Sequence, residues 1–288
     1  MTINYTKIKS KPAIFLRLFG VTPQQLEQIM KKLTPLWGKR VVSHYKRPGR
    51  NSKLSLEEAV VMLLLYYRSY TTQLHVGILF GIHESNVCRL IRRLEPLLAR
   101  IIAIPKQKEL TEENVTALLI DATEQPIERP KYNQQVFYSG KKKRHTLKTE
   151  IRTTPEGKIV HVSQSAPGSC HDFALYKKDP LRNKKIKVLA DSGYQGLDKL
   201  HPRTEIPYKK PKGKLLSESK KIYNRVLSRV RVKVENTLGN IKVFKILSER
   251  YRNKRLRYNV KFRIIAGIVN LKTHYMTIFS REKIRVAN

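Results

Sequence analysis

The spacing of apolar residues changes near residue 115, and this change restricts the chain to a helical region followed by an α/β region. Up to residue 101, apolar side chains recur every three or four residues, which predicts amphipathic helices. From residue 115 the pattern changes: the apolar run 115–120 is typical of a buried strand, and 186–190 predicts another short strand. The segments 147–153 and 159–162, with a turn between them, predict a hairpin or meander. One amphipathic helix is then predicted over 217–248, with an inward face formed by Ile222, Val226, Val230, Val234, Leu238 and Ile241. We therefore expect an all-α region and an α/β domain with a mixed sheet.

The helical region carries signals for helix starts and for a helix-turn-helix. Two starts show the reciprocal Ser/Thr-x-x-Glu/Gln cap, Thr22 with Gln25 and Ser55 with Glu58. A short helix over 72–80, a break at Gly81 and a longer helix over 84–101 predict the helix-turn-helix. The outer face of its second helix carries Ser85, Asn86, Arg89, Arg92 and Arg93. The alternative is a helical bundle whose basic residues form a solvated face.

The charge of the chain indicates what it binds. Lys and Arg number 59 against 22 Asp and Glu, so the formal net charge is +37, and 40% of the residues are hydrophobic. That apolar content supports a folded core, so the surface of a folded protein carries the charge. Such a surface calls for a polyanion, and nucleic acid is favoured over the competing membrane surface.

No segment of the sequence predicts a membrane anchor or a disulfide framework. The apolar run Val60–Tyr67 is far shorter than the roughly 20 residues that span a bilayer. Cys88 and Cys170 have no partner at metal-ligand spacing, and we expect both to be reduced. We therefore expect a cytoplasmic, nucleoid-associated protein that does not bind membranes.

Acidic residues are scarce, and their positions point to a metal site. Two of the five aspartates, Asp121 and Asp191, directly follow predicted buried strands. On the predicted long helix, Arg231, Glu235 and Lys242 fall within a wedge of about 40°. Three carboxylates that converge from these elements suit Mg²⁺ or Mn²⁺, and two such ions stabilise phosphoryl displacement. The alternative is that the aspartates are loop or capping residues and that Arg231 and Glu235 form an ordinary helical pair.

The motifs around these acids resemble DDE transposases of bacterial insertion sequences, in the branch that is similar to the eukaryotic Harbinger group. The matching segments are 120–124 with Pro126 and 129–130, 138–146, 167–168 with His171 and Asp172, 190–196, and Arg231 through Glu235 to Lys242. The resemblance covers essentially the whole chain. It implies an RNase H-like mixed-sheet catalytic core preceded by an all-α helix-turn-helix domain, with Asp121, Asp191 and Glu235 as catalytic residues and metal ligands. The tyrosine position of the family's helix signature holds Ser228 here.

The resemblance also implies an activity and a domain division. We expect a helical DNA-binding domain over 1–105 and a DDE catalytic domain over 106–288. The implied activity is metal-dependent strand cleavage at the ends of an element, followed by transfer of the freed 3′ hydroxyl into target DNA. We expect a homo-oligomer on DNA and two Mg²⁺ or Mn²⁺ ions. The alternatives are a catalytically idle DNA-binding protein of transposase ancestry, a simple repressor, and a nuclease that cuts without joining strands.

Further residues are candidates for DNA contact or for support of the site. The DNA-contact candidates are Arg89, Arg92, Arg93, Lys141, Lys142, Lys143, Arg144, Arg231 and Lys242. The run 141–145 has a solvated hairpin as its alternative. In the basic block 250–257, we expect Tyr251 and the adjacent Tyr258 to stack on bases. His171 and Asp172 are candidates to support the acidic site, with a helix N-cap as the alternative.

Overall fold

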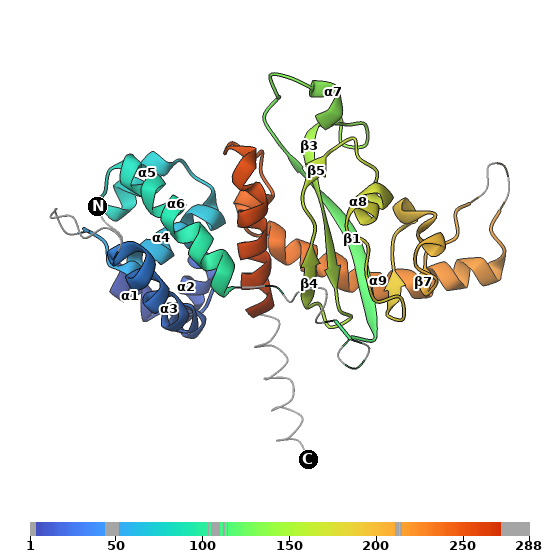
Figure 1. Cartoon of the computed structure of the whole chain (residues 1–288), viewed down its shortest axis with the longest axis horizontal. Coiled ribbons are helices and arrows are strands. Elements are labelled where there is room, and N and C mark those ends of the chain that lie inside the picture. The colour runs from blue at the N-terminus through green and yellow to red at the C-terminus, as the bar shows by residue number, and fades with distance from the viewer. Residues whose placement is uncertain are drawn as a thin grey trace, which may run out of the picture. The chain divides into compact units, whose positions relative to one another are not determined.

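The computed structural model describes residues 4–43, 52–102, 104, 110–111, 113, 115–210, 213 and 215–271. The chain forms two compact units (Figure 1). The helical unit comprises Met1–Ala103, Lys242–Glu249 and Arg255–Lys272, and the sheet unit comprises Ile104–Ile241, Arg250–Lys254 and Thr273–Asn288. Two segments that we expected in the catalytic domain, Lys242–Glu249 and Arg255–Lys272, thus belong to the helical unit.

The helical unit is built around one helix that is buried on nearly all sides. Its helices are α1 (Tyr5–Lys9), α2 (Pro12–Phe19), α3 (Pro23–Trp37), the π-helical segment η1 (Gly38–Val42), α4 (Leu56–Ser69), α5 (Gln73–Phe80), α6 (Glu84–Ile101), the 3₁₀ turns η5 (Lys245–Leu247) and η6 (Arg255–Arg257), and a helix over 258–271. Both predicted capping boxes form, at Thr22 and at Ser55. Every residue of α4 from Ala59 to Tyr67 is buried, as expected of a central helix.

The predicted helix-turn-helix forms from α5 and α6. Gly81 ends α5 in the left-handed conformation with φ +65, which glycine adopts without strain. A Cβ at Gly77 would lie 2.6 Å from the Ile82 carbonyl oxygen, so the turn requires glycine there as well. The inner face of α6 is buried at Val87, Ile91, Leu94 and Leu98. Its outer face is exposed at Asn86, Arg89, Arg92 and Arg93, and Ser85 is partly exposed.

A buried carboxylate on α6 holds the C-terminal helix in the helical unit. Glu95 is 1% exposed and accepts a hydrogen bond from the Tyr67 hydroxyl at 2.9 Å. Its two carboxylate oxygens also lie 2.9 Å from Lys261 Nζ and 3.2 Å from Arg257 Nη1. These contacts explain why residues 255–271 belong to the helical unit.

The expectation that Tyr251 and Tyr258 stack on bases is wrong. Tyr251 is 2% exposed, and its backbone pairs with Ile127 and with the Pro126 carbonyl of the sheet unit. Tyr258 is 1% exposed at the start of the last helix of the helical unit. Each ring therefore belongs to a core, where no base can reach it.

The sheet unit is a mixed sheet centred on β1 (Ala117–Pro126). One neighbour, β3 (Arg144–Thr153), is antiparallel to β1, and the other, β6 (Lys187–Leu189), is parallel to it. The remaining strands are β2 (Tyr138–Ser139), β4 (Ile159–Val162) and β5 (Ala166–Pro167), which pair with β3, and β7 (Thr204–Glu205), which pairs with β6. The order β2-β3-β1-β6-β7 gives the expected mixed sheet.

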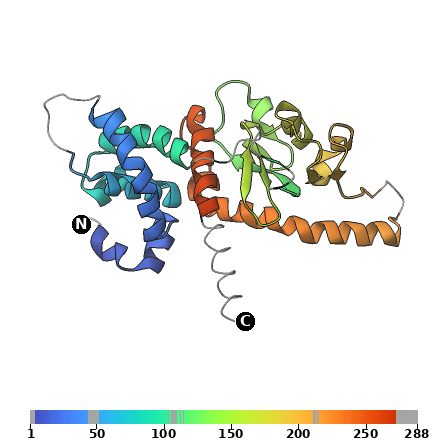
Figure 2. The same ribbon diagram turned by 60° about the horizontal axis from the view of Figure 1, so that its bottom comes forward.

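Helices cover the sheet on both sides. They are α7 (Gln134–Phe137), α8 (Asp172–Lys178), α9 (Glu218–Lys242) and the 3₁₀ turns η3 (Ser192–Tyr194) and η4 (Leu197–Lys199). Figure 2 shows α8 and α9 on opposite sides of the sheet. In the core on the α8 side, Leu118 and Ile120 pack with Val188 and Tyr176. No helix within the described residues is long and apolar enough to cross a membrane.

The long helix α9 differs from its prediction in length and in its buried face. It ends at Lys242 and not at residue 248, and the 3₁₀ turn η5 follows it. We expected Ile222, Val226 and Val230 to point inward, but they are 53%, 55% and 36% exposed. The buried residues of α9 lie mostly in its second half, which packs on the sheet, and Figure 1 shows the first half extending beyond the sheet. The apolar spacing therefore predicted a continuous face that the sheet only partly covers.

Candidate active site

Asp121 and Asp191 hold equivalent positions relative to the pairing of two parallel strands. The register of β1 and β6 pairs Leu119 with Leu189, and each aspartate lies two residues further along. The expectation that Asp121 follows the end of its strand is wrong, because β1 continues to Pro126 along its antiparallel partner β3. The shorter strand β6 ends before Asp191, so the two aspartates lie where the parallel pairing stops.

The surroundings of Asp121 are rich in negative charge. Burial raises the pKa of Asp121 to about 6, and the charges of Asp191 and Asp172 contribute to this rise. Two interactions oppose it, a hydrogen bond from the Ala122 N–H to Asp121 Oδ1 at 2.8 Å and the charge of Arg231. The carboxylates of Asp191 and Asp172 therefore lie close enough to Asp121 to act on it.

Arg231 of α9 joins the helix to the end of β6. Its Nη1 donates to Asp191 Oδ1 at 3.3 Å, and its Nη2 lies 3.9 Å from Glu235 Oε1. The Ser192 N–H donates to the same Asp191 oxygen at 2.5 Å. The Arg231 side chain is 12% exposed and that of Glu235 is 57% exposed. Arg231 thus lies between Glu235 and Asp191. In the described residues, no three Asp, Glu, His or Cys side chains gather closely enough to hold a metal ion.

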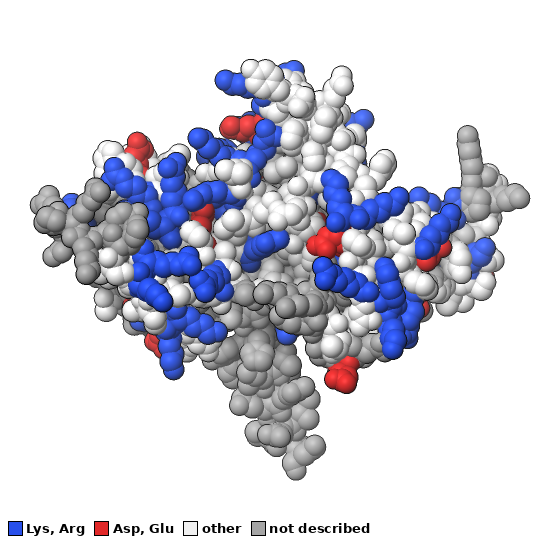
Figure 3. Space-filling model, in the orientation of Figure 1, with Lys and Arg blue, Asp and Glu red and all other residues white. Residues whose placement is uncertain are grey.

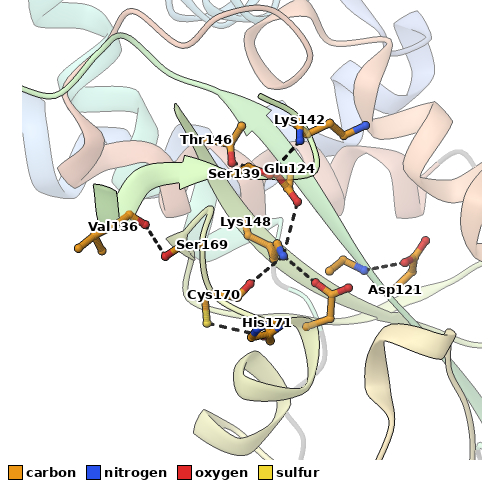
Figure 4. A network of polar contacts seen from close by, with 12 residues as sticks. Asp121, Glu124, Val136, Ser139, Lys142, Thr146, Lys148, Ser169, Cys170 and His171 are labelled. Carbon is orange, nitrogen blue, oxygen red and sulfur yellow. Dashed lines mark hydrogen bonds and ion pairs between the residues drawn. The ribbon is translucent and has the colours of Figure 1, made fainter. Parts of the chain in front are cut away.

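The structure adds Lys148 and Glu124 to the residues around this site. Lys148 Nζ lies 2.9 Å from Asp172 Oδ1 and 3.5 Å from Glu124 Oε1. Figure 4 shows Lys148 between Glu124 and the Cys170 carbonyl, which accepts a hydrogen bond from Nζ at 2.7 Å. Sequence reasoning missed Lys148, although the charged residues at every second position of the predicted strand 147–153, Lys148, Glu150 and Arg152, were a usable signal.

His171 and Asp172 lie at the start of α8. His171 is the N-cap residue, but its side chain makes no capping hydrogen bond in the described structure. Asp172 is the first residue of the helix, and its charge acts on Asp121. Asp172 is therefore close to the acidic site.

The other DNA-contact candidates lie on exposed surfaces of the two units. Lys141, Lys142, Lys143 and Arg144 are exposed at the turn between β2 and β3, and Lys242 is exposed at the end of α9. Figure 3 shows Lys and Arg side chains spread over the visible face of both units, with few Asp and Glu among them. Cys88 and Cys170 are half-buried free cysteines within the described chain.

Comparison with known proteins gives the family of the chain. A family model described as "DDE superfamily endonuclease" matches residues 120–271, and one described as "Helix-turn-helix of DDE superfamily endonuclease" matches residues 52–102. The α/β fold is that of an RNase H-like nuclease core preceded by a helix-turn-helix, as the resemblance implied. The chain belongs to the DDE superfamily endonucleases.

Two relatives are named as transposases. The chain is 42% identical over 232 residues to "Probable transposase for insertion sequence element IS702" of Microchaete diplosiphon, a match that covers 78% of this chain and 83% of that protein. It is 24% identical over 272 residues to "Putative transposase for insertion sequence element IS112" of Streptomyces albus G, a match that covers 93% of this chain and 97% of that protein. With its helix-turn-helix and endonuclease domains, the chain is a DNA-binding enzyme of the nuclease type.

Proposed function

We propose that this protein is a DNA transposase that cleaves strands at the ends of an insertion sequence and joins them to target DNA. The observation that carries the proposal is that Asp121 and Asp191 each lie two residues beyond the last paired residues of parallel β1 and β6, with Arg231 of α9 bonded to Asp191. The names of the two relatives support the same activity.

The donor set of the site fits a divalent cation. Asp121, Asp191 and Glu235 offer hard carboxylate oxygens, which Mg²⁺ and Mn²⁺ prefer. Burial raises the pKa of Asp121 beside the charges of Asp191 and Asp172, and a bound cation would favour its ionised form. We infer that these three residues hold Mg²⁺ or Mn²⁺, as two ions. Such ions, when bound, stabilise the charge on the attacking and leaving oxygens of a phosphoryl displacement.

The remaining residues of the site orient its carboxylates. The N–H groups of Ala122 and Ser192 each fix one oxygen of the preceding aspartate, and Arg231 fixes the same Asp191 oxygen from α9.

In cleavage, a water oxygen bonds to phosphorus, the bond from phosphorus to the 3′ oxygen breaks, and that oxygen takes a proton. In joining, the freed 3′ hydroxyl bonds to a target phosphorus, and a target 3′ oxygen leaves with the proton.

We assign the basic surfaces to two roles in DNA binding. Residues of α6, namely Arg89, Arg92 and Arg93, would read base edges in a groove at the element ends. The phosphate contacts would come from Lys141, Lys142, Lys143, Arg144 and Lys242, with Arg231 at the cleavage site. The protein would act as a homo-oligomer on DNA, associated with the nucleoid in the cytoplasm.

The proposal is tested with purified protein, Mg²⁺ and duplexes that carry the ends of the element. A transposase gives both a nicked strand and a product joined to a second duplex. Nicking without a joined product indicates a nuclease that does not transfer strands. Specific binding of the ends without nicking indicates the catalytically idle DNA-binding protein and overturns the proposal.

A further inference from the structure

Lys148 is a buried cation within the sheet unit. Lys148 is 8% exposed, and on β3 it pairs directly with Glu124 of β1. Removing an ammonium group from water is costly unless charged or polar partners surround it. The partners of Lys148 therefore indicate which part of the molecule depends on it.

Two of those partners belong to the segment that starts α8. Lys148 Nζ donates to the Cys170 carbonyl at 2.7 Å and lies 2.9 Å from Asp172 Oδ1. Its third partner, Glu124 Oε1, lies at 3.5 Å, and the Thr146 hydroxyl donates to the other oxygen of Glu124 at 2.9 Å. An ammonium group has three donors, and oxygens of three residues lie within 3.5 Å of Nζ. Lys148 thus ties Asp172 to the central strands.

The other oxygen of Asp172 faces the turn that carries Asp191. A Cβ built on Gly193 would lie 2.6 Å from Asp172 Oδ2, so the carboxylate packs directly on this turn where only glycine leaves room. The charge of Asp172 also contributes to the raised pKa of Asp121. Asp172 therefore lies beside both aspartates of the candidate active site.

The stability of the fold does not by itself explain why Lys148 and Asp172 are paired beside the two aspartates. A buried ion pair adds little net stability compared with apolar side chains of the same size. A third carboxylate placed near Asp121 and Asp191 adds repulsion, and a fixed cation behind it is needed to keep it there.

We propose that Lys148 is a positioning residue that holds the Asp172 carboxylate against the Gly193 turn, beside Asp121 and Asp191. Held there, Asp172 fixes the turn that carries Asp191 and adds negative charge that attracts a divalent cation. The inference rests on the proposed function, since the placement of Asp172 matters only if the acidic site acts on DNA.

The test compares Lys148→Met, Asp172→Asn and the double variant with the wild-type protein. The matched control is Lys187→Met, which removes another lysine of the sheet unit, one whose Nζ lies 2.6 Å from Glu205 Oε1. Three quantities are measured: the cleavage rate at saturating end DNA, the Kd for that DNA, and the rise in Tm that Mn²⁺ causes in the DNA-free protein.

Each single variant should lower the cleavage rate by about 10- to 100-fold, as is usual when a residue that orients metal ligands is removed. The rise in Tm with Mn²⁺ should shrink, while the Kd for DNA should stay unchanged. The double variant should be no slower than the slower single variant, because the two residues act as one unit. Lys187→Met should match the wild-type protein in all three measurements.

A wild-type cleavage rate and Mn²⁺ response in Lys148→Met overturn the inference, as do losses that multiply in the double variant. If Lys148→Met fails to fold, Asp172→Asn decides by the same measurements, since it keeps the shape of the side chain. Asp121→Asn distinguishes failure of the inference from failure of the proposed function. If Asp121→Asn cleaves normally, the proposed function fails and takes the inference with it; if only Lys148→Met cleaves normally, the inference alone fails.

Discussion

Asp121 and Asp191 each lie two residues beyond Leu119 and Leu189, which pair across the parallel strands β1 and β6. Backbone register therefore brings the two carboxylates together. A shift of one residue would move one aspartate to the opposite face of the sheet. The apolar core beneath, which includes Leu118 and Val188, fixes the register and so fixes the site.

The buried position of Asp121 predicts how stability changes with pH in metal-free buffer. The folded-state pKa is about 6, above the ordinary value of 3.8, so the folded state binds the proton more tightly than the unfolded state. The stability contribution of Asp121 is then fully present below the lower value and is lost as pH rises through the upper one. Asp121→Asn, which cannot ionise, should become more stable relative to wild type as pH rises from about 4 to about 7.

Urea unfolding in EDTA checks this prediction, with Asp198→Asn as the control at an exposed aspartate. The free energy of unfolding of the control should follow that of the wild-type protein at every pH. A constant difference between Asp121→Asn and wild type across the range would show that the Asp121 pKa is not raised.

The buried carboxylate of Glu95 is paired with Lys261 of the helix over 258–271. We therefore expect this helix to stabilise the helical unit. Glu95→Ala leaves Lys261, which is 4% exposed, without the carboxylate that lies 2.9 Å from it. Removing one partner of a buried ion pair costs about 3–5 kcal/mol. Glu95→Leu combined with Lys261→Met should recover much of that stability, because this pair then leaves no buried charge.

Urea unfolding followed by hydrogen exchange of the α6 amides measures this effect. A decrease in the free energy of unfolding for Glu95→Ala below about 1 kcal/mol, the size of a surface ion pair, would show that the carboxylate does not hold the last helix in place.

Sequence patterns predicted the local structure of the helical region but not the contacts between residues that are far apart in the sequence. Thr22 and Ser55 mark helix starts because the cap and its partner lie three residues apart. Glu95 and Lys261 are far apart in sequence, so no local pattern connects them. The exposed Ile222 and Val226 show the same limit, since helical spacing defines a face without saying what covers it.

The candidate site was predictable where one residue carried the signal. Asp121 and Asp191 stand out because acids are rare in this chain and both follow apolar runs. Lys148 was missed because its role depends on Asp172 and the Cys170 carbonyl, which a distant loop brings to it. The burial of Tyr251 was not predicted, because basic residues beside it in the sequence indicated an exposed surface.

We expect the protein to discriminate less well between DNA sequences when arginines on the outer face of α6 are removed. Arg89→Ala or Arg92→Ala should reduce the preference for element ends over scrambled duplex, by about 1–3 kcal/mol for a bidentate base contact. Competition binding on the two duplexes measures the preference. An equal decrease in affinity for both duplexes would show that these residues contact phosphates only.

We expect a different effect on DNA binding when the lysines at the turn between β2 and β3 are replaced. Replacing Lys141, Lys142 and Lys143 with alanine should weaken binding to all DNA alike. The slope of log affinity against log salt should flatten by about 0.9 for each phosphate that the variant no longer neutralises. A salt titration on both duplexes measures this slope. A reduced preference for the element ends with an unchanged slope would contradict the assignment.

The central claim, that Asp121, Asp191 and Glu235 form the catalytic site, is tested most directly by single-turnover cleavage of end DNA with Mg²⁺. The variants are Asp121→Asn, Asp191→Asn and Glu235→Gln, and Glu218→Gln is the control at another glutamate of α9. We expect each of the three variants to bind the DNA as the wild-type protein does but not to cut it, because the carboxylates serve the transition state and not docking. The control should cut normally. Cleavage by Asp191→Asn at the wild-type rate, or full wild-type cleavage in EDTA, would contradict the claim.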